Sequence, residues 1–401
     1  MTVKIFYCYA HEDKKLRAEL ENHLGILKQQ KLITGWSDRN INAGSEWEKE
    51  VDSNLNAANI ILLLISTDFV NSEYCYSVEM KRALERHENG TAKVIPIILR
   101  HVDYEGALFS HLQALPTDAV PVTDRKWRKH DEAFLDVAKG IRKVVKELLC
   151  DQWLYEGNIH FYRQQYNEAL AAFEQAIFHN STNALAFIGK GQVLNQLASY
   201  QDFLDDIDYY QRALEAFEQA ICLEPTNSHA YEGKGKALFA KEPSDKRDEI
   251  LSAYKQAICF DPKNMVAYIG QGKALMQYSR YEEALAAFEQ AIDIAPFPNQ
   301  EAYEGKEEAL YTLERYEEAL AACEQTNQEF PDSSYTFEIK GHALYNLQRY
   351  QEALAAFEKA ISLGRKSMVA HFVKTQKPTE IRAPFLLFCC YVFSMGVVSA
   401  L

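Results

Sequence analysis

One decamer, close to EALAAFEQAI, dominates the second half of this chain of 401 residues. Its copies follow one another at intervals of 44, 37, 34, 35 and 34 residues, beginning at Glu168, Arg212, Glu249, Glu283, Glu318 and Glu352. Repetition at a fixed period of roughly 20–50 residues indicates stacked supersecondary units, each of which buries its apolar face only against its neighbours. We therefore predict six helical repeats in this half of the chain.

Each copy places a small residue four positions before an aromatic residue, as Ala169 precedes Phe173, so that both lie on one helix face. Glycines upstream allow two helices to approach, at Gly157, Gly272 and Gly341, and prolines end second helices, at Pro225, Pro262, Pro296 and Pro331. This pattern resembles the tetratricopeptide (TPR) repeat, which implies an all-α superhelical solenoid over residues 151–365. The two longer intervals predict insertions in helix-connecting turns, near residues 200–211 and 241–246.

The net charge of −14 falls almost entirely on this array, because residues 1–150 hold 21 Lys and Arg against 22 Asp and Glu. An acidic array repels a phosphate backbone, so we expect no nucleic-acid partner. The TPR resemblance implies a groove that binds a protein or peptide ligand. A passive spacer or oligomer scaffold is the alternative.

The first 150 residues alternate between strand and helix patterns. Apolar runs at VKIFYC, IILLLIS and KVIPIIL, with shorter ones at residues 33–36 and near AVPVT, alternate with helical stretches, the last of them running from Asp131 to Leu149. Seven mostly aliphatic residues at 60–66 are typical of a strand buried on both faces. The alternation predicts a doubly wound, five-stranded parallel sheet, whose ligand crevice lies at the carboxyl ends of the strands.

Several blocks in this region carry a second resemblance: FYCYAHEDKKL, WSDRNINAGSEW, AANIILLLISTDFVNSEYC and VEMKRALERHENGTAKVIPIILR. Together they resemble the Toll/interleukin receptor (TIR) domain, over residues 1–150. The resemblance implies a flavodoxin-like α/β fold. It also implies one of two activities, since many members cleave NAD+ between nicotinamide and ribose, whereas others are adaptors that only self-associate.

Glu79 is the candidate catalytic residue. With Ser72 as N-cap, Cys75, Tyr76 and Glu79 share a helix face near the end of the third strand, although a solvated helix residue would show the same spacing. The TIR resemblance implies that this glutamate is essential for NAD+ cleavage, with NAD+ as substrate and no cofactor. A carboxylate there stabilises the oxocarbenium-like ribose left when nicotinamide departs, and water or adenine then traps it.

Enzymatic TIR domains often have tryptophan four residues before this glutamate, where the present chain has Cys75. Tyr76 is the candidate to stack on a base instead. The resemblance also implies that the loop after the first strand lines the nucleotide site, and that the loop after the second strand covers it and contacts a neighbouring TIR domain. These loops supply the remaining candidates: Tyr9, Ala10, His11 and Asp13 from the first, and Asp38, Arg39, Gly44, Ser45 and Trp47 from the second.

Two of these candidates have competing interpretations. Arg39 either binds a phosphate or forms a surface ion pair, and Trp47 is favoured as a core or interface aromatic over a stacking platform. His11 has no partner at metal-ligand spacing, and the eight cysteines include no CxxC pair. We therefore expect no metal site and reduced cysteines.

Residues 366–401 resemble neither family and end in FLLFCCYVFSMGVVSAL, seventeen residues without a charge. We interpret this segment as a C-terminal cap on the repeats or as a tail that anchors in a membrane. The N-terminus lacks a signal-peptide pattern, so we expect a cytoplasmic protein. The combined interpretation is a signalling or defence-type protein, as in bacterial immunity, whose TIR domain cleaves NAD+ on forming a homo-oligomer. The alternative is a non-enzymatic adaptor.

Overall fold

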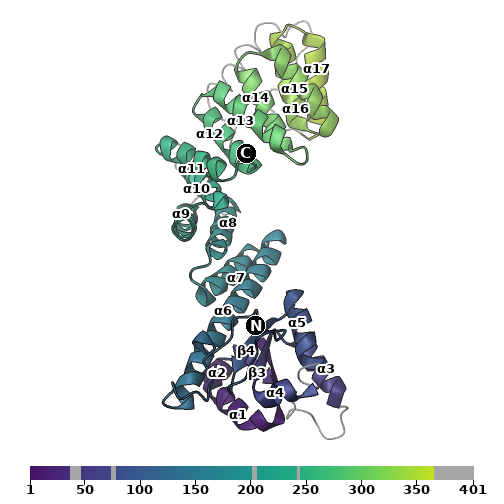
Figure 1. Ribbon diagram of the computed structural model, residues 1–401. Coiled ribbons are helices and arrows are strands. Elements are labelled where there is room, and N and C mark those ends of the chain that lie inside the picture. The colour runs from purple at the N-terminus through teal and green to yellow at the C-terminus, as the bar shows by residue number, and fades with distance from the viewer. Residues whose placement is uncertain (37–46, 74–77, 201–205, 242–243, 365–401) are drawn as a thin grey trace. The chain divides into compact units, whose positions relative to one another are not determined.

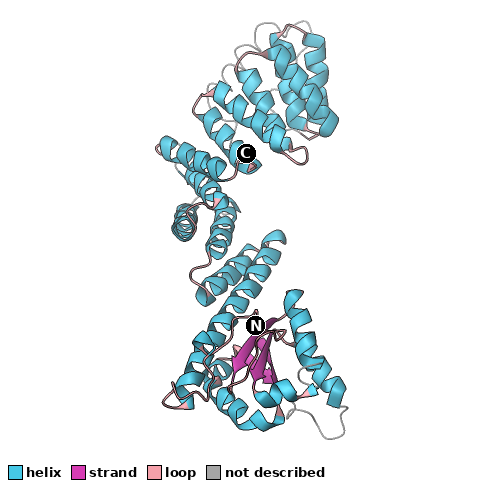
Figure 2. Ribbon diagram, in the orientation of Figure 1, coloured by secondary structure: helices cyan, strands magenta, loops and turns pink. Residues whose placement is uncertain are grey.

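The computed structural model describes residues 1–36, 47–73, 78–200, 206–241 and 244–364 (Figure 1). The chain divides into two compact units, Met1–Ala186 and a second that begins at Phe187. The first unit combines a sheet with helices, and the second consists of paired helices (Figure 2).

A parallel sheet forms the centre of the first unit. Within the described residues its strand order is β2-β1-β3-β4, with every neighbouring pair parallel. The strands are β1 (Val3–Tyr9), β2 (Ile33–Trp36), β3 (Ile60–Ile65) and β4 (Lys93–Ile98). Strand β3 is fully buried, as the aliphatic run predicted.

Helices cover both faces of this sheet. Residues Ile60, Leu62 and Leu64 pack with the helices α1 (Lys14–His23), α2 (Gly25–Gln29) and α6 (His130–Tyr162). The alternate residues of β3 pack with α3 (Trp47–Ala57), α4 (Thr67–Asn71) and α5 (Met80–Glu88). The alternation of strands and helices therefore gave the correct layer architecture.

The prediction of a fifth strand near AVPVT was wrong. Val122 N–H donates to Ile98 O at 2.9 Å and Thr123 N–H donates to Leu99 O at 3.1 Å, so this segment does follow β4. However, Pro116 and Pro121 have no N–H to donate, which prevents a continuous ladder. A short 3-10 helix, η4 (Thr117–Ala119), occupies the intervening residues.

Helix α6 continues past the predicted end at Leu149 to Tyr162. No proline or glycine interrupts the sequence between Cys150 and Glu156, and Gly157 faces the neighbouring α7 (Tyr166–His179), where Phe173 fills the space of a Cβ. The predicted domain boundary at residue 150 thus lies within one continuous helix. That boundary stays a prediction.

Paired helices form the rest of the described chain. The second unit begins within α8 and contains α8 (Ala184–Tyr200), α9 (Asp206–Leu223), α10 (Ser228–Lys241), α11 (Arg247–Phe260), α12 (Met265–Gln277), α13 (Tyr281–Ile294), α14 (Gln300–Thr312), α15 (Tyr316–Glu329), α16 (Ser334–Asn346) and α17 (Tyr350–Ser362). In the pairs α8–α9, α10–α11, α12–α13 and α16–α17, an aromatic residue of the second helix packs against a glycine of the first, as Phe288 packs against Gly272. The predicted prolines follow the ends of α9, α11, α13 and α15.

The two insertions behave differently. The second lies between the end of α10 at Lys241 and the start of α11 at Arg247, and its described residues 244–246 form a turn, as predicted. Part of the first instead lengthens α9 at its N-terminus, since this helix has 18 residues where α7 has 14. No described helix is both long and apolar enough to cross a membrane, and the predicted tail at 366–401 lies outside the described residues.

Candidate functional site

The carboxyl ends of the parallel strands bring three loops to one edge of the sheet. Strand β1 leads into Ala10 and the short 3-10 helix η1 (His11–Asp13), β3 leads into Ser66, and β4 leads to Arg100. Open α/β sheets bind ligands at this edge. The site is therefore built from residues that are far apart in the sequence.

Glu79 immediately precedes α5 and is only 7% exposed. Its Oε2 accepts a hydrogen bond at 2.8 Å from the thiol of Cys8, a fully buried residue of β1. A buried carboxylate is costly to keep unless it is hydrogen-bonded. Glu79 is thus a buried group beside β1, and the alternative of a solvated helix residue does not hold in this structure.

A second buried carboxylate ties the three loops together. Asp13 is 1% exposed, and its Oδ2 accepts a 2.5 Å hydrogen bond from the hydroxyl of Ser66. Arg100 donates from Nε to Asp13 Oδ1 at 2.9 Å and pairs with Asp68 at 2.7 Å. The hydrogen bond with Asp13 raises the pKa of Arg100. Loops after β1, β3 and β4 are consequently fixed by one ionic cluster.

Tyr9 lies on the opposite side of β1 from Cys8, because side chains alternate along a strand. The guanidinium carbon of Arg17 stands 5.1 Å from the centre of the Tyr9 ring, and Arg17 is 2% exposed. Arg17 also pairs with Glu21 at 3.3 Å. A buried cation thus supports the half-buried Tyr9 at the start of the site loop.

The predicted residues divide into three groups. The structure brings Tyr9, Ala10, Asp13 and Glu79 to the same sheet edge, with Ala10 buried and His11 exposed on η1. Trp47 begins α3, but its side chain lies outside the described part of the chain. The remaining candidates also lie outside it, namely Asp38, Arg39, Gly44, Ser45, Cys75 and Tyr76, and their roles stay predictions.

Ser72 is the C-cap residue of α4, a short helix that the sequence did not predict. Ser66 is the N-cap of α4, since its hydroxyl accepts a hydrogen bond from the N–H of Phe69 at 3.1 Å. The segment that would show whether Ser72 also caps the following helix falls at 74–77, beyond the described residues.

Three residues at this edge escaped the sequence prediction: Cys8, Ser66 and Arg100. Cys8 was interpreted only as a small apolar residue. For Ser66 and Arg100 a signal existed, because each is a polar residue directly following a buried aliphatic strand. Among the described residues, no group of three or more His, Cys, Asp or Glu is arranged to hold a metal ion.

Comparison with known families agrees with both halves of the fold. Residues 5–133 match the family model described as a TIR domain. Residues 154–210 and 269–334 match one tetratricopeptide repeat model, and residues 336–367 match another. The chain carries a TIR domain followed by TPR repeats.

A curated relative of this TIR–TPR chain is the uncharacterized protein y4lF of Sinorhizobium fredii (strain NBRC 101917 / NGR234). It is 49% identical over 141 residues, which are 35% of this chain and 43% of that protein. The match thus spans less than half of the relative's length.

Solved structures that resemble the chain include proteins described as TPR proteins. YrrB, described as a TPR protein with an unusual peptide-binding site, has a TM-score of 0.41 at 22% identity, covering 51% of this chain and 98% of YrrB. PilF of Pseudomonas aeruginosa has a TM-score of 0.49 at 13% identity, covering 58% of this chain and 99% of that one.

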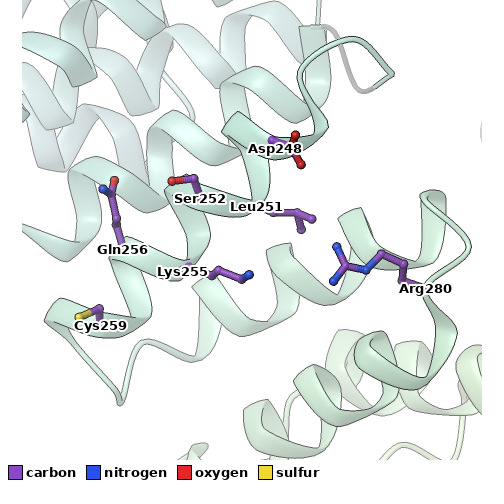
Figure 3. A pocket seen from close by; sticks show the side chains of 7 residues that line it. All are labelled: Asp248, Leu251, Ser252, Lys255, Gln256, Cys259 and Arg280. Atoms are coloured by element: carbon purple, nitrogen blue, oxygen red, sulfur yellow. The ribbon is translucent and has the colours of Figure 1, made fainter.

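The TPR array has a hollow of its own, of about 460 Å³, along α11 (Figure 3). The side chain of Arg280, from the turn before α13, extends toward α11, where Asp248 and Lys255 also line the hollow. Arg280 is held by Glu283 through a bond of 2.6 Å. Acidic and basic side chains thus line the same hollow.

Proposed function

We propose that the TIR domain cleaves NAD+ at the bond between nicotinamide and ribose, with Glu79 as the catalytic carboxylate. The observation that carries the proposal is the buried Glu79, held beside the carboxyl end of β1 by Cys8. A carboxylate fixed at the ligand edge of a parallel sheet is placed to stabilise positive charge that develops on a bound substrate.

The reaction needs one carboxylate. The glycosidic C–N bond breaks, its electron pair neutralises the pyridinium ring, and nicotinamide leaves without prior protonation. The ribose is left with oxocarbenium character, which the negative charge of Glu79 stabilises. Water then adds with loss of a proton to give ADP-ribose, or an adenine nitrogen of the same molecule adds to give a cyclic product. NAD+ is the substrate, and no cofactor takes part.

Other residues contribute to binding in this proposal. Tyr9, Ala10 and His11 line the site from the first loop, and Tyr76 stacks on a base. The second loop, with Asp38, Arg39, Ser45 and Trp47, closes the site and contacts a neighbouring TIR domain. Activity therefore depends on a homo-oligomer. The TPR array binds a protein or peptide that controls this self-association, as in defence-type signalling in the cytoplasm.

An adaptor without enzymatic activity is the second candidate. The observation that favours it is Cys75, which stands where enzymatic TIR domains often have tryptophan. In that case the TIR and TPR surfaces act only through protein–protein contacts.

Turnover of NAD+ by the full chain distinguishes the two candidates. The purified protein is incubated with NAD+ over a range of protein concentrations, beside Glu79→Ala, and the products are identified by chromatography. The enzyme proposal expects a rate per protomer that rises with concentration and disappears in Glu79→Ala. Absence of turnover at every concentration would leave the adaptor as the better description.

A further inference from the structure

Cys8 occupies a defined position in β1. Phe6, Cys8 and Ala10 lie on the sheet face that packs with Met80 of α5, whereas Tyr7 lies on the opposite face. Cys8 is 0% exposed. The side chain of Cys8 and the carboxylate of Glu79 therefore meet on this face of β1.

The thiol of Cys8 is a hydrogen-bond donor to Glu79. Its Sγ donates to Glu79 Oε2 at 2.8 Å, across 71 residues of sequence. A thiol is a weak donor toward neutral groups, but a bond to a charged acceptor is stronger. Since β1 is an interior strand hydrogen-bonded to both β2 and β3, the donor itself is rigidly held.

We propose that Cys8 is a positioning residue for Glu79, whose thiol holds the carboxylate in the orientation needed for catalysis. This inference rests on the function proposed above. It follows the general rule that a reacting group needs supporting hydrogen bonds to remain within a fraction of an ångström of its productive position.

The test compares Cys8→Ala and Cys8→Ser in the full chain, with nicotinamide release as the readout. We expect Cys8→Ala to lower kcat about 10-fold to 100-fold with KM changed less than about twofold, because the substrate contacts remain while the carboxylate loses its orientation. Cys8→Ser keeps a donor at the same position and is expected to retain kcat within about threefold. Cys150→Ala, which removes a buried thiol of α6 far from this pair in sequence, serves as the matched control.

The pH profile supplies a readout that loss of packing alone would not move. A hydrogen bond to the charged carboxylate favours the charged form, so its removal makes protonation easier. The acid limb of the kcat profile is therefore expected at higher pH in Cys8→Ala than in wild type, and unmoved in Cys150→Ala.

Infrared spectroscopy tests the contact without activity. The S–H stretching band isolated by the difference between wild type and Cys8→Ser should shift when Glu79 is replaced by Ala. A band that does not respond would overturn the proposal, even if Cys8→Ala failed to fold. Likewise, an active wild type with equal kcat and acid limb in Cys8→Ala would overturn this inference alone, whereas an inactive wild type would overturn the proposed function itself.

Discussion

Within the residues that the structure describes, two buried glutamates each lie beside a cysteine thiol, one in each part of the chain. Glu79 is 7% exposed and bonded to Cys8 at the edge of the sheet. Glu307 is 0% exposed within α14, and the fully buried Cys323 of α15 lies against it. The same pair of side chains thus occurs at a place where loops meet and at a place enclosed by helices.

The repeats themselves show what is unusual about Glu307. In the repeat before it, Gly272 lies 16 positions before Phe288, and the ring fills the space of the missing side chain. Gly341 and Phe357 form the corresponding pair in the repeat that follows. Here, Glu307 replaces the glycine and Cys323 replaces the aromatic residue. The larger side chain is now on the first helix, α14, and the smaller one on the second, α15. A polar contact thus takes the place of an apolar one.

Glu307 and Glu79 differ in the groups that surround each carboxyl. Burial raises the pKa of Glu307 to about 7, opposed by the hydroxyls of Thr326 and Thr336 and reinforced by the charge of Glu304. Burial also raises the pKa of the Cys323 thiol. Glu307 is enclosed among α14, α15 and α16, so we expect it to affect the stability of the fold and the dependence of that stability on pH. Glu79 instead adjoins the edge at which parallel sheets bind ligands.

The largest expected difference between the two glutamates is in turnover. Glu79→Asp keeps the charge but withdraws the carboxylate from Cys8 and from substrate, so NAD+ cleavage should fall about 10²-fold. Glu307→Asp should leave turnover unchanged within about twofold. Initial rates of nicotinamide release for the two variants at one protein concentration measure this. Equal losses in both would remove the distinction between them.

The exchanged volume predicts a strong coupling in stability. Cys323→Phe alone overfills the pair and Glu307→Gly alone leaves a cavity, each at a cost of about 2–3 kcal/mol. The double variant recreates the Gly272 and Phe288 pair and should cost less than the sum by about 2 kcal/mol or more. Urea denaturation of the wild type, the two single variants and the double variant gives the four unfolding free energies of a double-mutant cycle. If the losses of the two single variants simply add in the double variant, the two positions do not compensate for each other in volume.

The raised pKa of Glu307 predicts stability that falls as pH rises. Between about pH 4.5 and pH 7 the folded state keeps this carboxyl protonated while the unfolded state has released the proton, so alkaline conditions favour unfolding. The loss should reach roughly 3 kcal/mol above pH 7.

Glu307→Gln isolates this contribution, because the amide does not titrate. We expect the unfolding free energy of the wild type to fall between pH 5 and pH 8 by more than that of Glu307→Gln. Relative to the wild type, the variant should therefore be more stable at pH 8 than at pH 5. The comparison with Glu307→Gln is needed because His342 also makes stability depend on pH. Burial lowers the pKa of His342 to about 4, so its contribution to the unfolding free energy is lost as pH falls below about 6.5. This contribution is the same in both proteins and cancels in the difference. A pH-independent difference would show that Glu307 is not buried as a neutral acid.

The smallest predicted effect concerns one hydrogen bond. The hydroxyl of Thr336 donates to Glu307 Oε1 at 3.3 Å. Thr336→Val removes this bond at nearly constant volume, and we expect a loss of about 1 kcal/mol at pH 5 and a larger loss at pH 8, where the carboxyl is ionised. Denaturation at both pH values is the measurement, and an equal loss at both would argue against the contact.

The sequence predicted best what local pattern controls. Decamer spacing located the helical repeats, and the aliphatic run of β3 indicated a strand buried on both faces. The interruption at Glu307 and Cys323 was also visible as a departure from that repeat, although its meaning required the contact between α14 and α15. The fifth strand was wrong because two prolines disrupt a pattern that otherwise is typical of a strand.

Contacts between residues that are far apart in the sequence could not be predicted from local patterns. The bond between Cys8 and Glu79 depends on how β1 lies beneath the start of α5, and the cluster of Asp13, Ser66 and Arg100 depends on which strands are neighbours. A cysteine within an apolar strand carries no local sign of a polar partner. Only the strand order brings these groups together.

The most direct test of the central claim is nicotinamide release from NAD+ by the wild-type full chain, followed by NMR beside Glu79→Gln, with both proteins at the same high concentration. We expect nicotinamide release equal to the NAD+ lost, and a rate about 10²- to 10³-fold lower in Glu79→Gln, which keeps the shape of the side chain but removes its charge. Equal rates in the two proteins, or no release by the wild type, would contradict it.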